Sequence, residues 1–262
     1  MRELTWTPFF ALFHREISRF LKVIVQTVIT PFVNATLYLM IFGVSLGGQI
    51  ALAGDLPYMA FLIPGLVMMA CLNNSFQNTS SSIISSKFSG DLEDLKVAPF
   101  SAAQIIWALN LAALVRGLMV GSINFLIGQL CYHYMYGSYL QIAHPLYLLF
   151  FLFVGSLAFA NLGIMVAFWA RSFDQLSAVT GFILQPLLYL GGVFFSIESL
   201  PGFWKTIAMW NPLLYIINGV RYGILGTSDV SSMQAVTVTL AAFVLLQGWA
   251  IYSLKRGSFQ RW

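Results

Sequence analysis

The sequence predicts an all-α integral membrane protein with six transmembrane helices. Of the 262 residues, 59% are hydrophobic and only 8% are charged, whereas an ordinary soluble domain carries about 25% charged residues. So few charges cannot cover a water-facing surface. The mean hydropathy of +0.81 agrees with a membrane protein, and the length suits one helical bundle, so we expect a single domain over residues 1–262.

Charge-free stretches mark the expected spans, because a spanning helix needs roughly 20 apolar residues. No Asp, Glu, Lys or Arg occurs within residues 23–54, 56–86 or 117–170, and Asp55 marks a turn between the first two spans. The third stretch is long enough for two helices, separated near residues 132–145. The remaining two spans are expected at about 175–196 and 231–253.

The distribution of Lys and Arg predicts the orientation, since short cytoplasmic loops carry an excess of both. If the N-terminus is inside, the outer segments hold only Lys205 and Arg221. Both termini are therefore expected in the cytoplasm. Arg116 falls inside the third span, where a cation must face protein or water. The alternative is that its long side chain extends to the inner membrane interface. The inner segments hold Arg2, Arg15, Arg19, Lys22, Lys87, Lys96, Arg171, Lys255, Arg256 and Arg261.

Residues 1–22 predict an amphipathic helix that lies in the inner membrane interface. Apolar side chains recur at three-and-four spacing, and polar side chains occupy the opposite face. The alternative is that this segment only extends the first span into water. The apolar face is predicted to contain Trp6, Phe10, Phe13, Ile17 and Phe20.

The cytoplasmic segment 87–100, between the second and third spans, is the most charged stretch of the chain. Leu92 and Leu95 would form a narrow apolar edge on a short helix among acids such as Glu93, and Pro99 would end that helix. Such a protruding element could receive force from a cytosolic partner. The alternative is a solvated linker.

The outer segment 197–230 is too apolar for an exposed loop and too interrupted by Pro and Gly for a span. Non-helical backbone at membrane depth must be covered by protein or must line a water cavity. We therefore expect two short helices that re-enter the outer leaflet, and a plain interfacial cap is the alternative. The segment contains Pro201, Asn211, Pro212 and Arg221.

Two further observations concern chemistry. Asn73 and Gln77 make the second span polar at one end, so this face should meet another helix or a water-filled path. The chain has no phosphate loop of the GxxxxGK[ST] type, no HExxH or GxSxG and no CxxC, so we expect no catalytic, cofactor or metal site. The cations lie at the ends of apolar runs and form no patch for nucleic acid.

Several motifs in chain order carry a family resemblance that extends over nearly the whole chain. The chain resembles the permeases of type-2 ABC transporters, a group that includes polysaccharide, nodulation-factor and drug exporters. The motifs are YMAFLIPG at 58–65, GDLEDL at 90–95 followed by Pro99, GGVFF at 191–195, LP at 200–201, NPL at 211–213 and RYG at 221–223.

This resemblance implies a half-transporter in a bacterial inner membrane. Two permease chains, expected as a homodimer, would each rest on a separate cytosolic ATPase that binds ATP and Mg²⁺. An alternating-access cycle would export an amphipathic, lipid-like, glycan or drug substrate. The alternatives are a gradient-driven carrier or channel without an ATPase, and an assembly subunit. The residues implied in ATPase coupling are Gly90, Leu92, Glu93, Leu95 and Pro99.

Overall fold

The computed structural model describes residues 6–45, 47, 56–91 and 101–256. Helices make up the regular structure of these residues, and no strand occurs among them, as the sequence predicts. In chain order the helices are α1 (Thr7–Leu21), α2 (Ile24–Tyr38), the π-helical η1 (Leu39–Ser45), α3 (Tyr58–Ser89), α5 (Ala102–Tyr136), α6 (Pro145–Trp169), α7 (Phe173–Val179), the π-helical η2 (Thr180–Leu184), α8 (Gln185–Leu190), the 3₁₀ turn η3 (Ile197–Ser199), α9 (Gly202–Trp210), α10 (Pro212–Leu225) and α11 (Ser232–Arg256).

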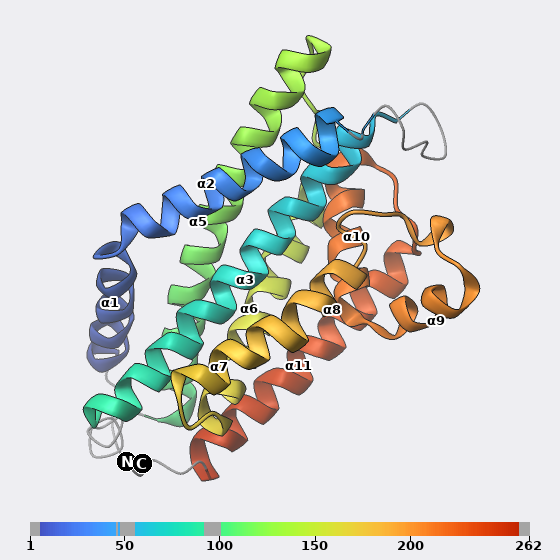
Figure 1. Ribbon diagram of the computed structural model, residues 1–262. Helices are drawn as coiled ribbons and strands as arrows, with labels where there is room; N and C mark the ends of the chain where they lie inside the picture. The colour runs from blue at the N-terminus through green and yellow to red at the C-terminus, as the bar shows by residue number, and fades with distance from the viewer. Residues whose placement is uncertain (1–5, 46, 48–55, 92–100, 257–262) are drawn as a thin grey trace.

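Five helices in the described part are long and apolar enough to cross a membrane, and they match five of the six expected spans. The expected fifth span corresponds to α7, η2 and α8, which follow one another as one rod (Figure 1). This stretch contains Asp174, Gln175 and Gln185 and is not one of the five, so a sixth span stays a prediction. The turn expected at Asp55 lies outside the described residues. The five are Ile24–Ser45, Tyr58–Ser89, Ala102–Tyr136, Pro145–Trp169 and Ser232–Lys255.

Helix α3 is the centre of the bundle. In its most apolar window 83% of the residues are buried, against 22% for α2 with η1. Helices α5 and α6 pack closely against it because small residues lie at the contacts. Gly117 of α5 faces Ser75 of α3, and Gly163 of α6 faces Phe76 and Thr79. The tight core therefore consists of α3, α5 and α6, and α2 lies largely outside it.

One apolar cluster joins the ends of five helices. It contains Phe9 of α1, Ile83 of α3, Ile105 of α5, Ile164 of α6 and Leu254 of α11. These helix ends therefore lie together at one end of the molecule. It is the end that carries Lys87 and Lys255, where the sequence predicts the cytoplasm.

Helix α1 forms over Thr7–Leu21, within the residues expected for it. Its residues buried in the protein are Phe9, Leu12, Glu16 and Phe20, of which only Phe20 belongs to the predicted apolar face. A position of α1 in the membrane interface stays a prediction. Trp6 and Phe10 are 63% and 60% exposed. Sequence periodicity did not indicate that the Glu16 carboxylate would be buried and paired with Arg15 and Arg19 of the same helix.

The segment 197–230 contains two short helices, α9 and α10, as expected from the sequence. Asn211 begins α10 by accepting a hydrogen bond from Leu213 N, and Pro212 occupies its first turn. Helix α10 is mostly buried and contacts α3, α6 and α11, whereas Trp210 at the end of α9 is 84% exposed. Re-entry into the bilayer stays a prediction.

Candidate functional site: a polar cleft

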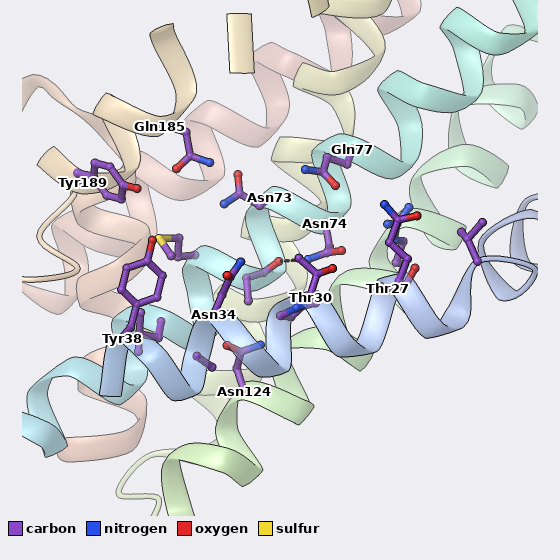
Figure 2. Close-up of a pocket in the computed structure, with 18 residues that line it drawn as sticks. Thr27, Thr30, Asn34, Tyr38, Asn73, Asn74, Gln77, Asn124, Gln185 and Tyr189 are labelled. Carbon is purple, nitrogen blue, oxygen red and sulfur yellow. Dashed lines mark hydrogen bonds between the residues drawn. The ribbon is translucent and has the colours of Figure 1, made fainter. Parts of the chain in front are cut away.

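A cleft of about 430 Å³ lies between α2, α3, α5 and the η2–α8 rod. Figure 2 shows polar side chains from these helices converging on it, with Asn34, Asn73 and Gln185 among them. No Asp or Glu lines it within the described part of the chain. The polar lining residues are Gln26, Thr27, Thr30, Asn34, Tyr38, Asn73, Asn74, Gln77, Arg116, Asn124, Gln185 and Tyr189.

The local sequence of α2 places one polar stripe on the cleft. Residues three and four positions apart share a helix face. Gln26, Thr30, Asn34 and Tyr38 follow this spacing on α2 and line the cleft together. The other faces of α2 are apolar, so this stripe is the part of the helix suited to a hydrated space.

The three residues that the sequence singles out for a pathway or interface lie together here. Asn73 and Gln77 face the cleft from α3, and Arg116 lines it from α5. Arg116 thus lies against a polar cavity, which is one of the surroundings expected for a charged residue within a span. Their role in transport stays a prediction.

An aromatic cluster lies at the end of the cleft nearer the 191–230 segment, where Tyr38 and Tyr189 line the cleft. The ring of Phe194 lies 5.4 Å from that of Tyr38, 5.0 Å from Phe42 and 5.6 Å from Tyr189. Tyr58 donates a hydrogen bond of 2.6 Å to the carbonyl of Phe194. Aromatic contacts at these spacings are stabilising, and the first turn of α3 holds Phe194 in the cluster.

Helix α1 is attached to α3 at the opposite end of the cleft. Glu16 is fully buried and pairs with Arg15 and Arg19, each at 3.1 Å. Arg19 also donates to the carbonyl of Asn78 at 2.6 Å and to Ser81 at 3.1 Å. A buried carboxylate needs this compensation, which the ion pairs supply within α1. The hydrogen bonds from Arg19 to Asn78 and Ser81 are what join α1 to α3, next to Gln77.

Of the residues implied in ATPase coupling, the structure describes only Gly90, which ends α3 with a φ of 88°. Such a left-handed conformation favours glycine. The other four, which are Leu92, Glu93, Leu95 and Pro99, lie outside the described residues.

The first two residues of the 87–100 segment, Lys87 and Phe88, contact α6 and α7. Lys87 donates to the carbonyls of Ala167, Phe168 and Ala170 at 2.6, 2.8 and 3.2 Å. These carbonyls belong to the C-terminal end of α6, where a cation is favourable. The ring of Phe88 stacks on that of Phe173, the first residue of α7, at 5.3 Å. The start of the 87–100 segment is therefore fixed to the α6–α7 junction.

The singled-out residues of the outer segment connect α9 and α10 to the end of α8. Pro201 precedes α9 as its N-cap. Asn211 donates to the carbonyl of Leu187 at 2.6 Å. Arg221 is buried and donates to the carbonyl of Gly192 at 2.7 Å and to Asn218 at 3.0 Å. Its guanidinium lies 3.7 Å from the ring centre of Phe61, so this predicted outer cation is a structural link in the interior.

Sequence reasoning missed an amide cluster between α5, α6 and α11. Asn110 donates to Asn161 at 2.9 Å and to Gln247 at 3.2 Å, and Asn161 donates to Gln247 at 2.9 Å. Single amides inside apolar spans were the available signal, because such side chains usually hydrogen-bond between helices. Among the described residues, no group of three or more His, Cys, Asp or Glu is placed to hold a metal ion.

Comparison with known proteins agrees with this architecture. The model of the ABC-2 type transporter family matches residues 7–225. The inner membrane transport permease YadH of Escherichia coli strain K12 is 36% identical over 260 residues, which cover 98% of this chain and 99% of the relative. Nodulation protein J of Rhizobium leguminosarum bv. trifolii is 25% identical over 233 residues, covering 86% and 84%.

The family match includes the cleft helices and the 197–225 part of the outer segment, and the relative of higher identity aligns almost end to end. The resemblance to type-2 ABC permeases is therefore confirmed. This chain is a membrane transport permease subunit that belongs to the ABC-2 type transporter family.

Proposed function

We propose that this permease is the translocating subunit of an ATP-driven exporter. It moves an amphipathic, lipid-like, glycan or drug substrate out of the cytoplasm or inner leaflet by alternating access, and a separate ATPase subunit that binds ATP and Mg²⁺ supplies the energy. The observation that carries this proposal is the attachment of the start of the 87–100 segment to two elements. Lys87 binds the end of α6, and Phe88 stacks on the first residue of the α7–η2–α8 rod, whose far end lines the cleft.

A continuous mechanical path supports the proposal. Force on the 90–99 segment reaches the end of α6 through Lys87 and the start of α7 through the Phe88–Phe173 contact. The rod continues from α7 through η2 into α8, which presents Gln185 and Tyr189 to the cleft. Tyr189 in turn contacts Phe194 in the aromatic cluster. A displacement at one end of the rod can therefore loosen the aromatic cluster at the other.

A second copy of the chain would complete the pathway. The apolar faces of α2 and of the rod are uncovered, with Phe32 at 50%, Val33 at 45% and Phe182 at 83% exposure. Both elements also border the cleft. A two-fold arrangement would place two such clefts opposite each other and cover these faces. We propose a homodimer in a bacterial inner membrane, with both termini cytoplasmic.

The double substitution Leu92→Asp with Leu95→Asp should release the ATPase and abolish transport. Burying each leucine in a partner groove would contribute roughly 1.5 to 3 kcal/mol, so losing both lowers affinity by roughly 100-fold or more. The measurement is co-purification of a soluble, phosphate-loop ATPase with the tagged permease. Glu93→Ala serves as the milder comparison, because a rim charge mainly orients a complex.

If the double variant binds the ATPase and transports normally, the 87–100 segment only connects two spans and is not the contact with the ATPase. If the unmodified chain recruits no ATPase, the exporter proposal fails and the gradient-driven carrier or channel takes its place.

Lys87→Met should uncouple transport from ATP hydrolysis, so that ATP is hydrolysed with less transport. The variant retains the proposed ATPase-binding residues but leaves three carbonyls at the end of α6 without their shared cation, so force no longer reaches α6 efficiently. We expect the amount transported per ATP hydrolysed to fall by about 10-fold while ATPase binding persists. Lys255→Met, at the exposed end of α11, is the matched control. An unchanged transport-to-hydrolysis ratio for Lys87→Met would contradict the proposed path.

A further inference from the structure

Arg116 carries a positive charge in the cleft that no described acid neutralises. The described residues that line the cleft with it are neutral. Glu16, the acid on neighbouring α1, is already paired with Arg15 and Arg19. A cation in a span is costly without a partner, so this site is electrostatically incomplete within the described part of the chain.

Two buried polar atoms of the cleft residues also lack hydrogen-bond partners. One is Nε of Arg116 on α5, and the other is the hydroxyl oxygen of Thr27 on α2. Thr27 is only 3% exposed, so bulk water does not readily satisfy its hydroxyl. Buried donors without partners cost free energy and are uncommon in folded proteins. Both residues line the same cleft, and both can donate a hydrogen bond.

We propose that Arg116 and Thr27 form a binding subsite for the anionic headgroup, phosphate or carboxylate, of an amphiphilic substrate. A guanidinium presents several N–H donors in a plane that matches both anions, and it accepts no hydrogen bond. The threonine hydroxyl adds a further donor. The neighbouring amides of Asn74 and Gln77 can pair with hydroxyl groups of the same headgroup. This inference rests on the proposed function, because it treats the cleft as the substrate pathway.

The surroundings favour an amphiphile over a free anion. Apolar residues such as Pro31, Leu66 and Met69 line the cleft next to its polar stripe. The bordering faces of α2 and η2 expose apolar side chains, including Ile29 at 54% and Ile183 at 52%. A headgroup at Arg116 can therefore be held while its hydrocarbon chain lies along these faces. A free phosphate ion would leave the apolar surface unused.

The test compares two fluorescent lipids with the same acyl chain on the purified chain in a neutral detergent. Lysophosphatidic acid carries an anionic headgroup, and lysophosphatidylcholine carries a zwitterionic one. We expect the unmodified chain to bind lysophosphatidic acid about 10- to 100-fold more tightly, the range expected for a charge-assisted hydrogen bond. Arg116→Gln should remove this preference. Arg116→Lys should retain part of it, because it keeps the charge but loses the planar donors.

Two further variants keep the test decisive if Arg116→Gln fails to fold. Thr27→Val has nearly the same shape as threonine and removes only the hydroxyl, so it should weaken lysophosphatidic acid binding by about 3- to 10-fold. Lys22→Gln removes an exposed cation near the same end of α2 but outside the cleft, and it should change binding by less than about 3-fold.

Equal affinity for the two lipids overturns the proposal. So does an unchanged preference in both Arg116→Lys and Thr27→Val. Inorganic phosphate serves as the competitor. If phosphate displaces lysophosphatidic acid at a phosphate concentration close to the dissociation constant of the lipid, the subsite binds a free anion instead. None of these measurements involves the ATPase. If the unmodified chain shows no lipid preference but recruits the ATPase, the subsite alone is refuted. If it shows the preference but recruits no ATPase, the exporter alone is refuted.

Discussion

Replacing Gly163 with leucine should leave almost no folded protein in the membrane fraction. A side chain at this position of α6 would begin with a Cβ atom 2.5 Å from the carbonyl oxygen of Phe76 and in collision with the hydroxyl of Thr79. The carbonyl belongs to the backbone of α3 and cannot rotate away. The same place holds the hydrogen bond from Thr79 to the Ala160 carbonyl, at 2.8 Å. Helices α3 and α6 would therefore have to separate, and the tight core would open.

The measurement is the monodisperse fraction in fluorescence-detected size-exclusion chromatography, with the thermal midpoint of what remains. Gly163→Ala should give an intermediate loss, because even one methyl group meets the Phe76 carbonyl. Gly248→Leu is the matched control within a span, since no heavy atom lies within 4 Å of a Cβ built at that position of α11. A Gly163→Leu variant as monodisperse and as stable as Gly248→Leu would contradict the close α3–α6 contact.

Replacing Arg221 with methionine should cost about 3 to 5 kcal/mol of stability, a loss typical of broken buried networks. Methionine fills much of the volume but leaves the Gly192 carbonyl without its 2.7 Å donor and Asn218 without its 3.0 Å donor. The stacking on Phe61 is lost as well. Helix α10 would lose its main polar link to the turn that ends α8, and the protein should aggregate on extraction.

Arg221→Lys separates charge from geometry. Lysine keeps the charge but cannot stack as a plane and bond to two acceptors in fixed directions, so we expect a partial loss of thermal stability. Lys205→Ala, a half-exposed cation on α9, should change stability by no more than about 0.5 kcal/mol. If Arg221→Met melts within a degree of Lys205→Ala, the buried arginine contributes far less than its contacts indicate.

The positions of most spans could be predicted, because charged residues are excluded from lipid-facing helices. The charge-free stretch 56–86 corresponds to α3 at Tyr58–Ser89, and the expected sixth span corresponds to α11 at Ser232–Arg256. Helix α5 begins at Ala102 and contains Arg116, as the sequence predicts for the third span, and the cleft gives the Arg116 side chain a polar surrounding inside the bundle. The exception is the expected fifth span, which is not among the helices apolar enough to cross a membrane in the described part of the chain.

The cleft was predictable only in part. Asn73, Gln77 and Arg116 stood out because polar residues are rare in apolar spans. The α2 residues Gln26 and Asn34 did not stand out as cleft residues, because a single sequence does not indicate which neighbouring helix a polar stripe faces. Contacts between distant segments were likewise invisible to periodicity, including the attachment of Lys87 to the end of α6.

The π-helical stretches of the described residues, η1 and η2, belong to two elements that border the cleft, α2 with η1 and the α7–η2–α8 rod. Helix α2 continues into η1, and α7 continues through η2 into α8. A π turn contains about one residue more than an α turn, and each residue of an α-helix advances by about 100° around the axis. Conversion of η2 to a regular α-helix would therefore rotate α8 by roughly this angle relative to α7. Gln185 and Tyr189 would swing out of the cleft while the helix stayed intact, so the lining of the pathway could change by a shift of one residue in helical register.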